Sequence, residues 1–222
     1  MIATPQLEHI EQVSDGWVKK YVLTYRMPDG TQHVYESASR KNLPAYRALL
    51  EENARHCRTL AAPPNESANE TAEPQPAQSS TSVDAVSIVG RTKRDTLLMI
   101  REFRYPLNSW CIAFPAGLID TGESLRACAN RELREETGYA LLEDSPLEVL
   151  PQAGYSSTGL TDETVQIVFA QIERAYEAQP ERNELIEAFE LPVADVPRFL
   201  KENQLPIGTR AQLVLEAFAR RR

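Results

Sequence analysis

The sequence predicts an α/β fold in which helices cover a mixed β-sheet, preceded by an N-terminal β-hairpin arm. Strand-like and helical segments alternate through residues 83–222, an order that packs helices against a sheet. Two β-rich runs near the N terminus flank a turn sequence. With 222 residues, 42% apolar and 25% charged, the chain has the composition of one globular domain with an appendage.

The arm, residues 1–40, is predicted to be a hairpin. Residues 17–26 and 31–39 are rich in β-branched and aromatic side chains. The segment Met27-Pro28-Asp29-Gly30 joins them, with a Pro that presets φ and a Gly that permits a positive φ. We expect two antiparallel strands joined by a tight turn.

Residues 41–82 are predicted to be an insertion that is first helical and then disordered. Asn42 can cap a helix over residues 42–60, and Pro44 falls in its first turn. Residues 62–82 contain no large apolar side chain, so they cannot bury enough surface to become ordered.

The third segment, residues 83–222, is predicted to be the enzyme domain. Its expected strands span residues 83–89, 96–103, 147–153, 164–172 and 184–191. Its expected helices span residues 124–137, 193–203 and 208–221.

Charge and cysteine content exclude several functions. A net charge of −8 gives no general reason to bind nucleic acid or an acidic membrane. The apolar runs fall far short of the roughly 18 residues of a membrane helix, and residues 1–16 do not resemble a signal peptide. Three widely spaced cysteines suit free thiols, so a cytoplasmic or nuclear location is expected.

The helix predicted over residues 124–137 carries acids on its apolar face. At about 100° per residue, one stripe contains Leu125, Ala129, Glu132 and Glu136, flanked by Cys128, Leu133 and Glu135. The opposite side carries Arg126, Asn130, Arg134 and Thr137. A solvated charge run would place its acids on that opposite side.

Clustered carboxylates on a packed face are costly unless a cation neutralises them. Oxygen-only ligands favour Mg²⁺, with Mn²⁺ as the alternative, whereas zinc would recruit His or Cys. The three histidines lie far away, at positions 9, 33 and 56. The stripe therefore predicts a site for a hard divalent cation.

This segment resembles the Nudix box, the signature of the Nudix hydrolases. The matching residues are Gly117, Glu123, Arg131, Glu132, Glu135, Glu136 and Gly138. The resemblance implies a Nudix α/β/α sandwich and attack by water on a diphosphate. It also implies that Glu132, Glu135 and Glu136 bind the metal with the carbonyl of Ala116. Glu123 and Arg131 would support the helix and loop.

Two further segments resemble the ADP-ribose and ADP-sugar pyrophosphatase subfamily. They are residues 101–106 and 111–120, and the resemblance makes Arg104 a phosphate ligand, a role that suits its planar guanidinium. The subfamily binds adenine between aromatic residues of two subunits. This implies a homodimer, formed through the arm, that binds substrate with Trp17, Tyr35, Glu36 and Arg40.

The subfamily takes its catalytic base from a loop beyond the box. Alignment of residues 184–192 indicates Glu184, with Glu181 as the alternative. Ala113 and Thr158 depart from the subfamily pattern, in which an acid and a proline are usual. The resemblance covers residues 17–40 and 83 to about 200, so the insertion has no counterpart in compact members.

The resemblance implies Mg²⁺-dependent hydrolysis of ADP-ribose to AMP and ribose 5-phosphate. One alternative is another nucleoside diphosphate substrate, such as an oxidised nucleotide or a different sugar nucleotide. The other is a nucleotide-binding module without catalysis, because fold and function need not travel together.

Overall fold

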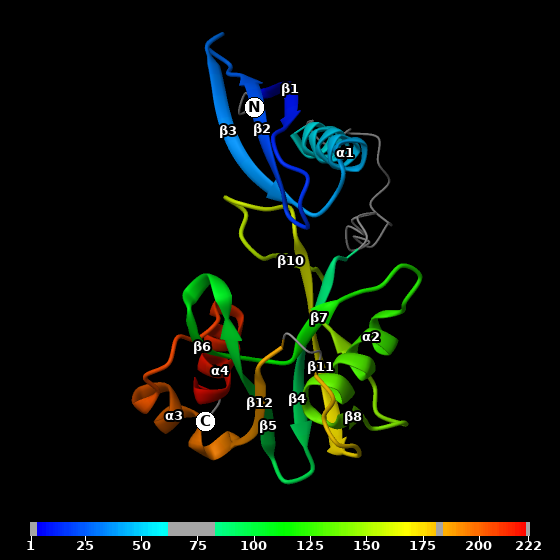
Figure 1. The fold of residues 1–222 in the computed structure, drawn as a ribbon, viewed down its shortest axis with the longest axis vertical. Helices are drawn as coiled ribbons and strands as arrows, with labels where there is room; N and C mark the ends of the chain where they lie inside the picture. Colours follow the sequence, from blue (N-terminus) through cyan, green and yellow to red (C-terminus); the bar gives the residue numbers. More distant parts are fainter. Residues whose placement is uncertain (1–3, 62–82, 181–183, 221–222) are drawn as a thin grey trace, which may run out of the picture. The chain divides into compact units, whose positions relative to one another are not determined.

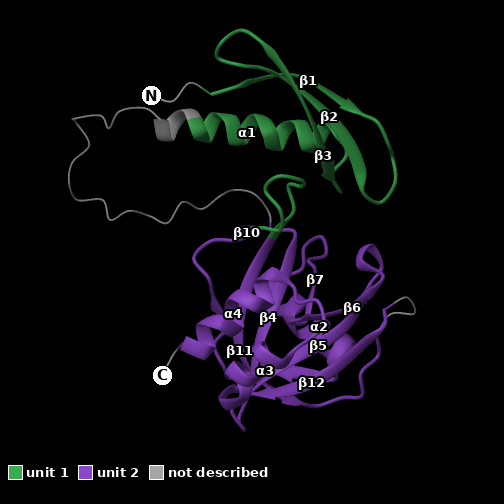
Figure 2. Cartoon of the chain, turned by 90° about the vertical axis from the view of Figure 1, so that its left-hand side faces the viewer, with its two compact units in different colours: residues 1–82, 155–164 green, residues 83–154, 165–222 purple. Residues whose placement is uncertain are grey.

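The chain forms two units in the computed structural model, which describes residues 4–61, 83–180 and 184–220 (Figure 2). The described residues of the first unit are 4–61 and 155–164. Those of the second are 83–154, 165–180 and 184–220. The loop at residues 155–164, which the sequence places within the third segment, therefore clusters with the arm.

The arm contains the expected hairpin and one further strand. Strands β2 (Lys19–Arg26) and β3 (Gln32–Ser39) pair antiparallel, and Gly30 in their turn has φ +84°. Strand β1 (Gln6–Gln12) pairs antiparallel with β2, which gives the order β1-β2-β3. The sequence did not predict β1 because only Ile10 in it is fully buried, so its apolar alternation is weak.

Helix α1 (Leu43–Ala61) packs against this sheet. The predicted cap is confirmed, since the Asn42 Oδ1 atom accepts a hydrogen bond of 3.0 Å from the Ala45 amide. Apolar side chains of the helix and the sheet form a small core of Ile10, Tyr21, Leu23, Tyr46 and Leu49. The segment predicted to be disordered, residues 62–82, lies outside the described residues.

The second unit is built on a mixed sheet, as predicted (Figure 1). Its strands follow the order β10-β11-β4-β5-β12, with β6 beside β5, β7 beside β4, and β8 and β9 beside β11. Strand β4 (Ala85–Thr92) runs parallel to β11 (Thr164–Arg174), while β5 (Thr96–Arg104) and β12 (Ile186–Pro192) pair antiparallel. The short strands are β6 (Ser109–Ala113), β7 (Ala116–Leu118), β8 (Tyr139–Leu141), β9 (Glu148–Val149) and β10 (Gly154–Tyr155).

Helices cover both faces of this sheet. Helix α2 (Leu125–Glu132) packs on one face, where Val86, Ile88 and Leu98 are buried. Helices α3 (Val196–Glu202) and α4 (Thr209–Arg220) pack on the other face. Neighbouring residues of one strand point to opposite faces, so a single strand supplies both cores.

Most of the predicted elements of this unit are present, but one strand is much shorter than expected. Residues 147–153 were expected to form a strand, and only Glu148–Val149 do so. Strands β6, β7 and β8 were not predicted, because three to five residues are too few for a period to be recognised. No helix in the described ranges is long and apolar enough to cross a membrane.

Candidate functional site

The acidic helix begins and ends where the sequence indicates. The Ser124 hydroxyl accepts a hydrogen bond of 3.2 Å from the Ala127 amide, so Ser124 caps the helix. Gly138 ends it with φ +74°, a left-handed conformation that glycine adopts without strain. Between them, α2 continues as a π-helical turn over Leu133–Thr137. Single π turns within helices are rare and often occur at functional sites.

The predicted acidic stripe is confirmed for its two central members. The exposed fractions of Glu132 and Glu136 are 8% and 5%, beside fully buried Cys128, Ala129 and Leu133. Two carboxylates therefore lie within a packed layer, where an unpaired charge is costly. The side chain of Glu135 is 41% exposed and lies at the edge of this layer.

The placement of Thr137 on the solvent side was wrong. Its exposed fraction is 2%, and its hydroxyl donates a hydrogen bond to the Leu133 carbonyl. The π turn bonds i to i+5, so the regular 100° spacing used for the prediction does not hold over its five residues.

Burial and neighbouring acids raise the pKa of the central carboxyl groups. The pKa of Glu136 lies well above its ordinary value because the group is desolvated and because Glu132, Glu102 and Glu184 add negative charge nearby. Burial also raises the pKa of Glu132, although Arg131 opposes that shift. Several acids that repel one another are thus held close together.

Arg131 connects these acids to the preceding loop. Its guanidinium donates to both oxygens of Glu123, at 3.0 and 2.9 Å, and to the Leu118 carbonyl at 2.9 Å. It also donates to Glu132 at 2.7 Å and to Glu135 at 3.3 Å. The hydrogen bonds from Arg131 are the main reason that the pKa of Glu123 falls to about 2. Arg131 therefore joins the loop to the acidic helix.

Strand β7 places the backbone against the two buried acids. The Ala116 amide donates a hydrogen bond of 3.2 Å to Glu136 Oε2. At Gly117 an added Cβ would overlap the carboxylate of Glu132. A glycine is needed here for close approach of the chain to that carboxylate.

Strand β5 contributes an acid that the sequence reasoning missed. The side chain of Glu102 is 14% exposed, and its Oε1 lies 2.6 Å from Nη1 of Arg104. Its negative charge is one cause of the raised pKa of Glu136. An acid two residues before Arg104 was a visible signal, but only the fold shows that this strand end lies beside the acidic helix.

The structure describes one of the two candidate catalytic bases of the loop, Glu184. Glu184 precedes β12, and its charge contributes to the raised pKa of Glu102, Glu132 and Glu136. It therefore lies close to the acidic helix. Glu181, the alternative base, lies outside the described residues.

The arm residues form a separate group in the first unit. Trp17 and Tyr35 are 74% and 42% exposed. The Lys20 ammonium lies 2.7 Å from Glu36, and Arg40 is ion-paired with Glu163. Trp17 and Tyr35 do not contact one another, because Leu23, the cross-strand partner of Tyr35, lies six residues after Trp17. Trp17 lies in a bend before β2, and the strand from Lys19 to Leu23 alone spans about 13 Å.

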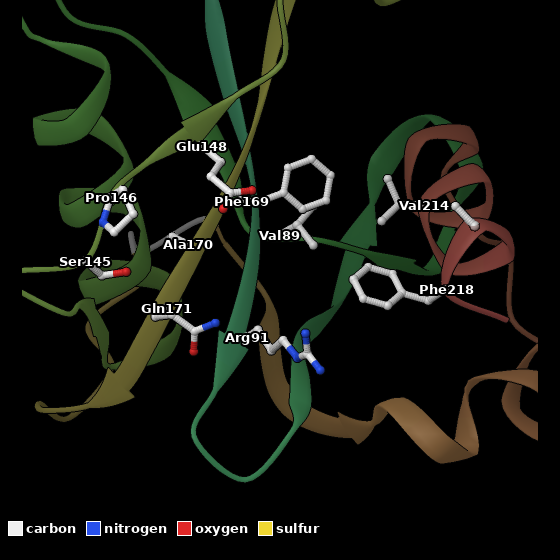
Figure 3. Close-up of a pocket in the computed structure, with 11 residues that line it drawn as sticks. Val89, Arg91, Ser145, Pro146, Glu148, Phe169, Ala170, Gln171, Val214 and Phe218 are labelled. Atoms are coloured by element: carbon white, nitrogen blue, oxygen red, sulfur yellow. The ribbon is translucent and has the colours of Figure 1, made fainter. Parts of the chain in front are cut away.

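A cavity of about 330 Å³ opens on the other face of the sheet (Figure 3). Val89, Phe169, Val214 and Phe218 turn toward one another there, away from the acidic helix. It lacks the clustered acids of α2, so the chemistry of the chain points to the acidic helix rather than to this cavity.

The donor set beside α2 fits a hard divalent cation. Glu132, Glu135 and Glu136 offer carboxylate oxygens, and desolvated carboxylates that repel one another gain most from a bound cation. In the described part of the chain no three candidate ligands converge tightly on one point. Arg131 instead holds Glu132 and Glu135.

Several proteins of known name are similar to this chain in sequence. The chain is 28% identical over 201 residues to the ADP-ribose pyrophosphatase of Saccharomyces cerevisiae, covering 86% of this chain and 71% of that protein. It is 47% identical over 62 residues to the ADP-sugar pyrophosphatase of Mus musculus, covering 26% of this chain and 28% of that protein. For the ADP-ribose pyrophosphatase of Bacillus subtilis the identity is 29% over 123 residues, covering 54% of this chain and 64% of that protein.

The fold is also that of a solved structure and of a protein family. The crystal structure of an ADP compounds hydrolase matches with a TM-score of 0.66 at 21% identity, covering 99% of this chain and 94% of that chain. The family model for the NUDIX domain matches residues 81–210, more than half of the chain. The chain belongs to the Nudix family.

Proposed function

We propose that this Nudix protein hydrolyses the diphosphate of ADP-ribose, or of a related ADP-sugar, to AMP and ribose 5-phosphate. The observation that carries the proposal is the pair of buried carboxylates, Glu132 and Glu136, held beside Glu135. The pyrophosphatases of yeast, mouse and Bacillus support the choice of substrate.

Glu132, Glu135 and Glu136, with the carbonyl of Ala116, would hold Mg²⁺, or Mn²⁺ as the alternative. When bound, such a cation neutralises diphosphate charge and lowers the pKa of a bound water. Arg131 donates to Glu132 and Glu135, whereas Glu136 accepts a hydrogen bond from the Ala116 amide. Glu123 lies on the far side of Arg131 and supports the loop.

The remaining residues position the substrate and move a proton. The Arg104 guanidinium, now paired with Glu102, offers a planar fork to a phosphate. Glu184 accepts a proton from water as the water oxygen attacks one phosphorus. The bond between that phosphorus and the bridging oxygen breaks, and the electron pair leaves with the other phosphate. Arg131 acts only by holding Glu132 and Glu135 in place.

The first test is steady-state hydrolysis. We expect the highest kcat/KM for ADP-ribose among ADP-ribose, ADP-glucose, diadenosine diphosphate and 8-oxo-dGDP at one Mg²⁺ concentration, and no turnover after EDTA. A higher kcat/KM for 8-oxo-dGDP than for ADP-ribose would contradict the proposed substrate. Binding of ADP-ribose without hydrolysis of any compound would indicate a nucleotide-binding module.

The arm, residues 1–40, is proposed to bind adenine and to form a homodimer. Trp17, Tyr35, Glu36 and Arg40 carry this proposal, because the two aromatic side chains are exposed and an aromatic ring can stack on a base. A base held between two rings needs them on its opposite faces, and Trp17 and Tyr35 of one chain are too far apart. A second copy can supply the missing ring.

Mixing two inactive variants tests the shared site. We expect Tyr35→Ala and Glu136→Gln chains, unfolded and refolded together, to regain about a quarter of wild-type activity. Half of the random dimers are mixed, and each mixed dimer has one intact site if the two residues come from different chains. Each variant refolded alone is the control. If the refolded mixture regains no activity, Tyr35 and Glu136 of one site belong to the same chain, and the proposal of a site shared between two chains is wrong.

The three free cysteines, one exposed and two buried, support a cytoplasmic or nuclear compartment. Fractionation of cells that produce the full chain checks this location.

A further inference from the structure

A cavity of about 270 Å³ lies within the first unit, between the arm sheet, α1 and the loop at residues 155–164. Four tyrosines line it, together with small polar and aliphatic side chains. The tyrosines are Tyr25, Tyr35, Tyr46 and Tyr155. Sites for drug-sized molecules begin at about 300 Å³, so this space suits a single ring system.

Hydrogen bonds fix the walls of this cavity. The Tyr35 hydroxyl donates to the Gly159 carbonyl at 2.6 Å, so its ring spans from β3 to the loop. The Ser37 and Tyr46 hydroxyls share a hydrogen bond of 2.7 Å, which joins β3 to α1. The Ala38 amide donates to the Leu160 carbonyl at 2.8 Å. Tyrosines held in this way present ring faces that lose little freedom on binding.

Two of the polar side chains that line the cavity, Asp162 and Asn53, differ in whether a ligand can reach them. Asp162 Oδ2 is buried without a hydrogen bond, but it lies 3.0 Å from the Lys41 ammonium and is closed to a ligand. Asn53 of α1 also lines the cavity, and it is exposed. Its carboxamide makes no hydrogen bond to another described residue. Among the residues that line the cavity, Asn53 is thus the one with a carboxamide, which can donate to and accept from a ligand edge at the same time.

We propose that α1 completes the binding cavity for the adenine ring, and that Asn53 is the residue that selects adenine over guanine. This inference rests on the proposed function, in which Tyr35 stacks on the base. A carboxamide donates to N7 and accepts from the N6 amino group of adenine at the same time. Guanine offers two acceptors on that edge, O6 and N7, so its pairing with the carboxamide is incomplete.

The inference gives the helical part of the insertion a role. Tyr46, Leu50 and Asn53 all come from α1, and all line the cavity beside Tyr35. The motifs that resemble the pyrophosphatases lie outside this helix, so they gave no reason to assign a base-reading residue there. The aromatic rings supply affinity for any base, and Asn53 supplies the discrimination.

Binding of AMP and GMP to the full chain tests the inference by calorimetry. We expect Asn53→Ala to weaken AMP binding about tenfold and to change GMP binding less than about twofold. Glu51→Ala, an exposed residue of the same helix outside this cavity, should leave both affinities unchanged. Alanine favours helix, so Asn53→Ala is not expected to unfold α1.

Three results would overturn the inference: wild-type AMP affinity in Asn53→Ala, an equal loss for AMP and GMP, or wild-type AMP affinity in Leu50→Trp, which fills the cavity. AMP is not hydrolysed, so this test is separate from the proposed reaction. If the full chain binds AMP more tightly than GMP but does not hydrolyse ADP-ribose, the proposed reaction is contradicted and the cavity assignment is not. If the full chain hydrolyses ADP-ribose but Asn53→Ala keeps the wild-type preference for AMP over GMP, the cavity assignment is contradicted and the proposed reaction is not.

Discussion

Replacing Glu136 by Gln is expected to lower kcat for ADP-ribose about 10³-fold at saturating Mg²⁺. The change keeps the size of the side chain and its place in the packed layer, where the residue is 5% exposed. It removes the negative charge that the neighbouring acids and burial make most costly. Steady-state AMP release measures the effect, and Glu202→Gln, an exposed acid on α3, is the matched control.

The same variant is expected to be more stable than the wild type in EDTA at pH 8. The raised pKa of Glu136 means that the folded chain holds this proton more tightly than the unfolded chain does. Wild-type stability is therefore complete below pH 4.5, the ordinary value, and falls as pH rises toward the folded pKa. Glutamine does not titrate, so the difference in melting temperature should grow with pH above 4.5 and vanish below it.

Mg²⁺ should reverse this order. A cation that neutralises the acids raises the melting temperature of the wild type by mass action, and it raises that of Glu136→Gln less. A kcat of Glu136→Gln close to that of the wild type would show that Glu136 does not take part in catalysis. If Glu136→Gln and the wild type have equal melting temperatures in EDTA at every pH, burial of the Glu136 carboxylate does not destabilise the fold.

The fold was largely predictable because its strong signals are local. The Pro-Asp-Gly turn, the Asn42 cap and the apolar runs of β4 and β5 each depend on a few neighbouring residues, and the structure contains all of them. Strand β1 depends instead on pairing with β2, and its own sequence carries little pattern. The grouping of the loop at residues 155–164 with the arm is likewise a matter of tertiary contact.

The sequence could predict the part of the candidate site that lies on one helix. Regular spacing placed Glu132 and Glu136 on the buried face, and both are buried. It failed for Thr137, where the helix widens into a π turn. Glu102 was missed because its approach to α2 depends on the packing of β5 beside the helix. The base-reading role proposed for Asn53 depends on a cavity between three segments that are distant in sequence.

Replacing Gly117 by Ala is expected to lower kcat about 100-fold while the fold stays intact. An added Cβ would lie closer than 3.0 Å to the carboxylate carbon and both oxygens of Glu132, nearer than real Cβ atoms come to other atoms. The end of a Glu side chain can swing aside at small cost to stability. Its carboxylate would move by about 1 Å, and a shift of that size at a reacting centre can cost a factor of about 100.

Gly154→Ala is the matched control, because nothing lies within 4 Å of a Cβ at that position. We expect both variants to melt within about 2 °C of the wild type, with the loss of AMP release confined to Gly117→Ala. Equal activity of the two variants would show that the position of Glu132 does not limit the reaction. A large fall in the melting temperature of Gly117→Ala would show that Glu132 cannot swing aside, and that this glycine serves the fold as much as the chemistry.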